Sequence, residues 1–163
     1  MKEQRLQVVK QQSHLDTNKE TICQYSTFSL AGNLFGIDVM KVQEVVKPMQ
    51  MTKVPLAPPF VRGLINLRGQ IATAIDMRAL LGLEENSEKD KQMNVICVAD
   101  GALLSLLVDE IGDVLDVSNR SFEETPDTVP QSVRRFMTGL HKIPGNLLSV
   151  IDTKKVFSHL NET

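Results

Sequence analysis

The chain has 163 residues, which is about one domain by the usual length relation. Hydrophobic residues make up 42% and charged residues 23%, a balance typical of a globular protein and too apolar for a disordered one. Eighteen Lys and Arg stand against twenty Asp and Glu, and there is one Tyr and no Trp. This composition argues against nucleic acid or an anionic membrane as the main partner, because such binding needs clustered uncompensated cations and, for bases, an aromatic stacking platform.

The cysteines and histidines give no sign of a metal site, a disulfide framework or a cofactor. Cys97 lies in an apolar run and is predicted to be a small buried hydrophobic residue, and Cys23 is the other cysteine. His14, His141 and His159 are scattered without metal-ligand spacing. Residues 1–22 are polar and do not resemble a signal peptide, and no apolar run is long enough to span a membrane. The sequence therefore predicts a cytoplasmic protein without a bound metal or cofactor.

Taken in chain order, the sequence begins with a polar segment and continues as a series of short strands. Residues 1–22 are predicted to be a flexible polar tail. Apolar runs separated by glycine turns favour strands, because glycine adopts the positive φ that a tight hairpin demands. The expected strands are 24–30, 34–39, 43–47, 62–67, 70–75, 93–99, 102–108, 112–117, 137–143 and 146–151.

Helices and connections complete this expected order. Two short helices should follow Ile75 and Ile151, with Asp76 and Asp152 as N-caps that accept hydrogen bonds from free backbone N–H groups. The charged segment 84–92 is predicted to be a solvated linker. Residues 119–132, which contain two prolines, are predicted to be a long irregular connection.

An internal repeat is the most informative feature of the sequence. A shift of 76 residues places Phe60, Gly63, Leu64, Gly69, Ile75 and Asp76 on Phe136, Gly139, Leu140, Gly145, Ile151 and Asp152. A shift of 69 residues places Gly32, Leu34, Val39, Glu44 and Val45 on Gly101, Leu103, Val108, Asp113 and Val114. The chain therefore reads as two copies of one unit of about five strands, which is the number that a small closed barrel needs. We expect two small β-barrels sharing one core.

The repeat also raises the hypothesis of an aspartic-protease dyad formed by Asp76 and Asp152. That site needs a small residue and then glycine after each aspartate, whereas helix-forming residues follow here. The capping interpretation is therefore favoured. Phosphate-binding loops, nucleophile elbows and zinc-protease motifs are absent from the sequence, so recognition by surface residues is the better expectation.

Two charged residues stand out as candidates for such a surface. Glu44 is surrounded by valines, and Arg68 lies at the tip of the predicted hairpin 62–75. A planar guanidinium on a rigid turn suits bidentate pairing with a carboxylate, within the chain or across an interface. Two simpler alternatives remain open: Arg68 as a solvated turn arginine, and Glu44 as an ordinary exposed acid.

The segments around these residues resemble the CheW family of chemotaxis coupling proteins. The resemblance rests on 36–46, 59–71 with its Asn-Leu-Arg-Gly motif, 75–78, 108–115 and 136–140. It implies a mainly β fold of two five-stranded SH3-like β-barrels around a shared hydrophobic core, with short helices, in a CheW-like domain over residues 23–160. Thr73 is a departure, because the family often has proline there.

The resemblance also implies a function. Members of the family are adaptors, not enzymes, and link the cytoplasmic tip of a methyl-accepting chemotaxis receptor to the regulatory domain of the histidine kinase CheA within membrane receptor arrays. The positions that match partner-binding positions of the family are Val42, Glu44, Gly63, Arg68 and Val114. Two alternatives remain: a small β-barrel that binds nucleic acid, and an adaptor of a non-flagellar motility or other receptor–kinase pathway.

Overall fold

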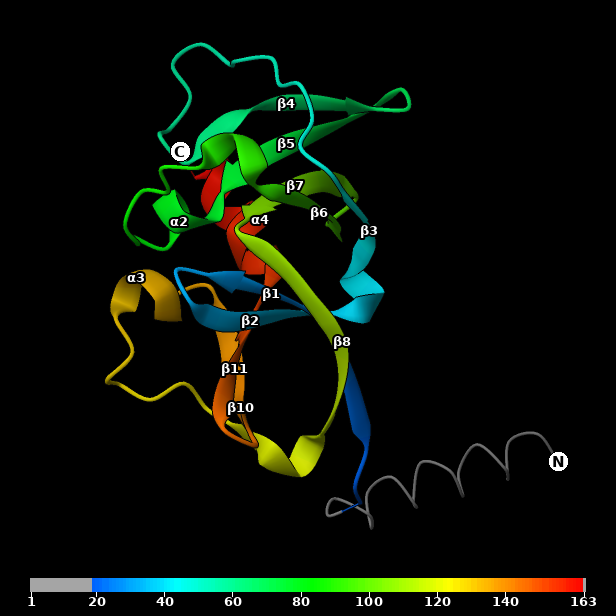
Figure 1. The fold of residues 1–163 in the computed structure, drawn as a ribbon, viewed down its shortest axis with the longest axis vertical. Coiled ribbons are helices and arrows are strands. Elements are labelled where there is room, and N and C mark those ends of the chain that lie inside the picture. Colours follow the sequence, from blue (N-terminus) through cyan, green and yellow to red (C-terminus); the bar gives the residue numbers. More distant parts are fainter. Residues whose placement is uncertain (1–18, 163) are drawn as a thin grey trace, which may run out of the picture.

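The computed structural model describes residues 19–162, and the strands dominate them (Figure 1). The predicted tail lies almost wholly outside the described residues. The strands are β1 (Ile22–Leu30), β2 (Asn33–Asp38), β3 (Val42–Val46), β4 (Val61–Leu67), β5 (Gln70–Asp76), β6 (Met93–Ala99), β7 (Ala102–Val108), β8 (Glu110–Ser118), β9 (Phe122–Glu123), β10 (Met137–Ile143) and β11 (Asn146–Ile151). The helices are η1 (Val39–Lys41), α2 (Met77–Leu80), η2 (Lys89–Lys91), η3 (Asn119–Ser121), α3 (Gln131–Arg134) and α4 (Thr153–Asn161).

Every predicted strand is present, and both predicted helices are capped as expected. The Asp76 carboxylate accepts a hydrogen bond from the Ala79 N–H at 3.2 Å, and Asp152 accepts one from the Lys154 N–H at 2.9 Å. The capping interpretation of the two aspartates is therefore confirmed.

Two connections are more structured than the sequence predicts. The segment 119–132, expected to be irregular, contains η3, the short strand β9 and the start of α3. The segment 84–92, expected to be a solvated linker, contains η2 and ends on Gln92, which is 3% exposed. Residues 84–91 are all exposed or half-buried, so the solvated character of that linker is confirmed up to Gln92. The additional structure depends on contacts with distant strands: β9 pairs with β10, and Gln92 accepts a hydrogen bond from Arg62.

The strands form two sheets. The six-stranded sheet has the order β8-β1-β2-β11-β10-β9, and the five-stranded sheet has the order β3-β6-β7-β5-β4. In Figure 1 the five-stranded sheet lies above the six-stranded sheet, and β8 runs down from the upper sheet to the lower one. Each sheet contains one parallel pair, β5 with β7 and β11 with β2, where its two hairpins meet.

The two repeats exchange hairpins. The hairpin β1–β2 of the first repeat lies beside β10–β11 of the second, and β6–β7 of the second lies beside β4–β5 of the first. Each third strand also crosses over, because β3 pairs with β6 and β8 pairs with β1. The mainly β class and the duplication are confirmed, but each sheet is built from both repeats rather than from one.

The strand registers follow the same internal symmetry. Val42 pairs with Cys97 at the start of β3. The shift of 69 residues relates Val42 to Ile111 and Phe28 to Cys97. Ile111 and Phe28 form the matching pair in the other sheet. A strand irregularity follows in both ladders, so the repeat extends to the position of the β-bulge.

Each sheet is drawn toward closure by a bent segment. β8 pairs with β1 at one end of the six-stranded order, and after η3 the same segment pairs with β10 at the other end, as β9. In the five-stranded sheet the chain leaves β3 and forms an isolated bridge between Thr52 and Leu64 of β4. The ladders of the described residues close neither sheet. The structure therefore shows one sheet of six strands and one of five in place of the two closed five-stranded barrels expected from the sequence.

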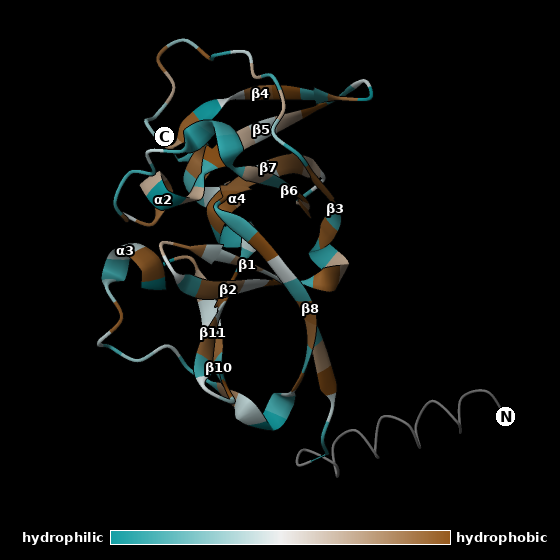
Figure 2. Ribbon diagram, viewed as in Figure 1, coloured by the Kyte–Doolittle hydropathy of each residue, from teal (hydrophilic) through white to brown (hydrophobic). Residues whose placement is uncertain are grey.

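The main core lies between the two sheets. It includes Phe28 and Ile37 from one sheet and Leu104 and Leu106 from the other. In Figure 2 brown, hydrophobic stretches alternate with teal and white ones along the strands of both sheets. Cys97 is fully buried in this core, and burial raises the pKa of its thiol to about 12, so it acts as a packed hydrophobic residue, as predicted.

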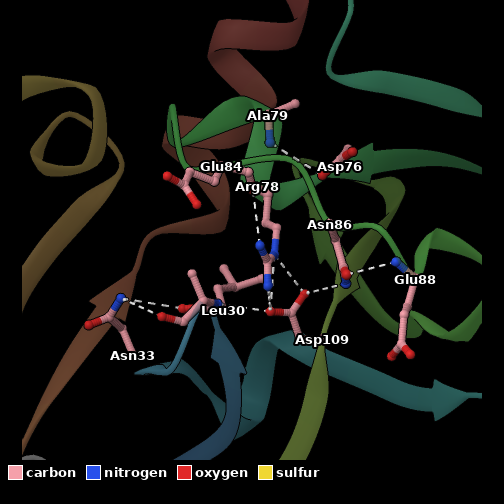
Figure 3. A network of polar contacts seen from close by, with 10 residues as sticks. Leu30, Asn33, Asp76, Arg78, Ala79, Glu84, Asn86, Glu88 and Asp109 are labelled. Atoms are coloured by element: carbon pink, nitrogen blue, oxygen red, sulfur yellow. Dashed lines mark hydrogen bonds and ion pairs between the residues drawn. The ribbon is translucent and has the colours of Figure 1, made fainter.

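A polar network ties the two sheets together at one side of the core (Figure 3). Arg78 of α2 donates from Nε to Asp109 at 3.0 Å, and Asp109 also accepts from the N–H of Ala31 in the β1–β2 turn at 2.8 Å. Asn86 donates to the same carboxylate at 3.2 Å. Burial alone would raise the pKa of Asp109, but these hydrogen bonds outweigh it and hold the pKa below its usual value.

Candidate functional site

The β4–β5 turn presents Arg68 at an exposed tip. Arg68 and Gly69 both have positive φ, at 52° and 88°, which is the backbone of a two-residue type I′ turn. Asn66 stabilises this turn, because its side-chain oxygen accepts a hydrogen bond from the Gly69 N–H at 2.9 Å. The guanidinium therefore stands on a rigid support, and its side chain is 69% exposed.

Arg68 forms a bidentate ion pair with Glu44. One contact joins Nη1 to Oε2 at 3.3 Å, and the second joins Nη2 to Oε1. The hydrogen bond from Arg68 lowers the pKa of Glu44, and the same bond raises the pKa of Arg68. The sequence analysis named both residues as candidates and left the carboxylate partner of Arg68 open; the structure pairs Arg68 with Glu44 across 24 positions of chain.

The pair joins two distant parts of the five-stranded sheet. Glu44 lies on β3 at one end of the strand order, while Arg68 follows β4 at the other end. The β4–β5 tip and β3 lie toward the same side of the molecule in Figure 1. The arrangement leaves most of the Arg68 side chain exposed to solvent. A carboxylate of another protein could therefore replace Glu44 as the partner of the guanidinium or bind the guanidinium beside Glu44.

Val42 does not share the exposed face of Glu44. From Val42 to Glu44 the strand β3 advances two residues, while its partner advances only one, from Cys97 to Ile96. This bulge breaks the usual alternation and turns the two side chains to opposite faces. Val42 is half-buried and packs against the main core, whereas Glu44 is on the face of its ion pair.

Val114 lies on the other sheet and is freely accessible. It belongs to β8, pairs with Ser26 and is 58% exposed. Its counterpart in the first repeat is Val45, which pairs with Val95 and is 37% exposed. At this repeat position both valines, Val45 and Val114, are therefore exposed, whereas Val42 packs against the core.

Gly63 has a structural reason to be glycine. It is buried, has a φ of +152°, and a Cβ built there would lie 2.6 Å from the Thr52 carbonyl oxygen. That oxygen accepts the Leu64 N–H at 2.8 Å, so it cannot move away easily. A larger residue would therefore disturb the bridge that joins the β3–β4 connection to β4.

The sequence analysis did not select two exposed hydrophobic residues that are close in sequence to Arg68 and Glu44. Ile71, three residues after Arg68, is 57% exposed, and Met40 in η1, four residues before Glu44, is 85% exposed. Ile71 could have been found, because it falls out of phase with the buried alanines at 72 and 74. Met40 gave no such signal, because it lies in a single turn of 3-10 helix.

Comparison with known proteins supports the resemblance seen in the sequence. The family model of the CheW-like domain matches residues 24–161. The chemotaxis protein CheW of Rhizobium meliloti is 30% identical over 80% of this chain and 84% of its own length. CheW of Bacillus subtilis is 30% identical over 79% of this chain and 83% of its own.

A solved structure agrees with the fold. The scaffolding protein TtCheW from Thermoanaerobacter tengcongensis superposes with a TM-score of 0.74 and is 31% identical, covering 81% of this chain and 90% of TtCheW. The likeness therefore extends over both sheets rather than one motif. The chain belongs to the CheW family of non-catalytic chemotaxis adaptor proteins.

Proposed function

We propose that this adaptor links the cytoplasmic tip of a methyl-accepting receptor to the regulatory domain of a CheA-type histidine kinase. The observation that carries the proposal is the bidentate Arg68–Glu44 pair, displayed on an exposed hairpin of a CheW-like domain. The protein would act in the cytoplasm and join receptor arrays through these partners. None of the helices in residues 19–162 is long and apolar enough to cross a membrane.

The charged pair and the aliphatic residues have different tasks in this proposal. Apolar contacts from Val114 and Val45 supply docking area, because burying exposed aliphatic side chains is favourable. The Arg68–Glu44 pair sets the orientation, because charged groups at an interface contribute to register and specificity more than to raw affinity. Val42 and Gly63 stabilise the fold around the site: Val42 packs against the core, and Gly63 allows the close approach of the Thr52 backbone.

The nucleic-acid alternative is not favoured. The matched family is one of chemotaxis adaptors, and the chain has a formal net charge of −2. Salt-dependent nucleic-acid binding depends on cations that neutralise phosphates. Here the most prominent exposed arginine, Arg68, is already paired with a carboxylate.

The proposal is tested by titrating the full chain with a receptor tip fragment and with the kinase regulatory domain. We expect Arg68→Ala to weaken binding to one of the two by about 2 kcal/mol, roughly thirtyfold in Kd, without loss of folding. Arg134→Ala is the matched control, because Arg134 also forms an exposed ion pair, with Asp127 at 2.6 Å.

A charge exchange separates recognition from support. The double variant Glu44→Arg with Arg68→Glu can restore the ion pair within the chain but reverses its direction. If the pair is read by a partner, folding is kept and binding stays weak. Full recovery of binding in the exchange variant would assign the pair a purely structural role, and failure of the wild-type chain to bind either protein would refute the proposed function.

A further inference from the structure

The connection between β3 and β4 contains a leucine in a conformation that normally selects glycine. The N–H of Ala57 donates to the carbonyl oxygen of Val54 at 3.4 Å and closes a turn with Pro55 and Leu56 at its centre. Leu56 has a φ of +59°. Proline followed by a residue of positive φ is the pattern of a type II turn, whose third position favours glycine or asparagine.

Leu56 differs from the other non-glycine residues of positive φ in the described chain. Ala31, Arg68 and Asp100 each precede a glycine in a two-residue hairpin turn. Leu56 has no such role, and it is fully exposed, with a relative accessibility of 105%. Its side chain therefore contributes no burial to the fold, while its backbone is strained, a combination found at ligand-contacting positions.

The connection that carries Leu56 is stiff. Pro55 precedes the leucine, and Pro58 and Pro59 follow it, which limits the number of backbone states. The base is fixed by the Thr52–Leu64 bridge, with N–H to O distances of 2.9 and 2.8 Å. In Figure 1 the connection arches beyond β4 at the edge of the molecule. A stiff loop loses little conformational entropy when it binds.

The charges around the loop point to an acidic partner. From residue 45 to residue 75 the chain has four cations, Lys47, Lys53, Arg62 and Arg68, and no Asp or Glu. Arg68 is paired with Glu44, and Arg62 lies 3.6 Å from Asp76. Lys47 and Lys53 are exposed and have no ion pair with any residue of the described chain. The loop is therefore a basic island in a chain of net negative charge.

We propose that the loop is a second docking element, in which Leu56 enters an apolar socket of a partner protein and Lys53 contacts carboxylates at its rim. Two unpaired lysines and one leucine are too few to hold a protein on an anionic membrane, which takes several basic residues or a lipid chain. A second copy would have to match the same basic loop with an acidic, apolar socket. A distinct acidic protein surface is the better complement.

This inference rests on the proposed function, because the partner proteins used to test it are the receptor tip and the kinase regulatory domain. The variant is Leu56→Asn, since asparagine accepts positive φ without the added freedom of glycine. We expect its thermal midpoint to equal or exceed that of the wild type, while its Kd for one partner rises roughly tenfold. Leu147→Asn is the control, as another exposed leucine at a hairpin turn.

The outcomes are distinguishable. If the wild type binds both partners and Leu56→Asn binds them equally well, the docking role of the loop is overturned and the proposed function stands. If the wild type binds neither partner, both proposals fail. Lys53→Glu should weaken the same complex, and by less at high salt. Two other results would contradict the proposal, because Leu56 would then contact something other than an acidic protein. One is self-association that Leu56→Asn abolishes, and the other is binding to vesicles of phosphatidylserine and phosphatidylcholine that Leu56→Asn abolishes.

Discussion

Val42 and Glu44 stand two positions apart on one strand, yet their side chains serve different purposes. The bulge in β3 places Val42 against the core beside Cys97 and Glu44 beside Arg68. Sequence could single out Glu44 and Arg68 as candidates, but it left open that they pair with each other. It could not predict the bulge, because two-against-one pairing is decided by the partner strand.

Replacing the two valines of the predicted site should therefore affect different properties: Val42→Ala the stability of the fold, and Val114→Ala the binding of a partner. Val42→Ala should lower the free energy of unfolding by about 1–2 kcal/mol, because it removes half-buried core contacts. Val114→Ala should change stability by less than about 0.5 kcal/mol, because Val114 is exposed, and should weaken partner binding instead. Urea unfolding of both variants checks this, and equal destabilisation would contradict the assignment.

Gly63 offers a test of backbone packing at the same scale. Gly63→Ala should destabilise the fold by roughly 1–3 kcal/mol, because its Cβ would meet the Thr52 carbonyl. Gly69→Ala is the control: its φ of +88° is also unfavourable for alanine, but nothing lies within 4 Å of the added carbon. Chemical denaturation should give the larger loss for Gly63→Ala, and the reverse order would exclude the clash as its cause.

At the scale of elements, a buried histidine fastens the bent segment of the six-stranded sheet. His141 of β10 lies between Tyr25 of β1 and Ser121 of η3, with both ring nitrogens 2.8 Å from a hydroxyl oxygen. Ser121 donates its own proton to the Ser118 carbonyl at 2.9 Å. His141 must then donate from Nδ1 to Ser121, and its Nε2 accepts from Tyr25.

This arrangement requires a neutral imidazole. Burial lowers the pKa of His141, and burial together with Cys23 and Asp38 raises the pKa of Tyr25 to about 12. A histidine with a lowered pKa in the folded state contributes stability above its ordinary pKa of about 6.5 and loses it as the pH falls. Protonation would place a proton on Nε2, facing the Tyr25 hydroxyl, and weaken the contact.

As the pH falls below the ordinary histidine pKa of about 6.5, stability should therefore decrease more steeply in the wild type than in His141→Phe, which cannot titrate. Hydrogen exchange locates the effect: amides of η3 and β9 should lose protection, while amides of β4 and β5 in the other sheet should not. A pH dependence that is the same in both proteins would contradict the role of His141. Tyr25→Phe should reduce stability at neutral pH, because it removes the hydrogen bond.

The strands themselves were the most predictable elements. Alternating apolar residues and the turn glycines located all ten longer strands, and the aspartates after β5 and β11 located both caps. The strand β9 has only two residues and exists through its pairing with Leu140 and His141. Such a short strand has no periodicity of its own, so a sequence pattern cannot predict it.

At the scale of the whole molecule, duplication produced two sheets that cannot be separated. The repeat was visible in the sequence, but the exchange of hairpins was not, because pairing between distant segments leaves no local pattern. The sheets are further joined by the Arg78–Asp109 ion pair, whose side chains are 16% and 14% exposed. We expect this network to hold the Arg68–Glu44 pair of one sheet and Val114 of the other in a fixed relative position.

Asp109→Asn tests that expectation. The change keeps the shape but removes the charge that binds Arg78, and should cost roughly 2 kcal/mol at neutral pH. Because the pKa of Asp109 is lowered in the fold, the wild-type advantage should be present above the ordinary carboxyl range and disappear as the pH falls through the lowered value. Unfolding curves at several pH values measure this, and an advantage that persists in strong acid would contradict it.

The proposed function requires that one folded unit binds receptor and kinase at the same time. Sedimentation velocity of the chain mixed with a receptor tip fragment and a kinase regulatory domain tests it directly. We expect a complex that contains all three proteins, and we expect Arg68→Glu to lose this complex while the chain stays folded. Displacement of one partner by the other, or a three-protein complex that Arg68→Glu leaves intact, would contradict it.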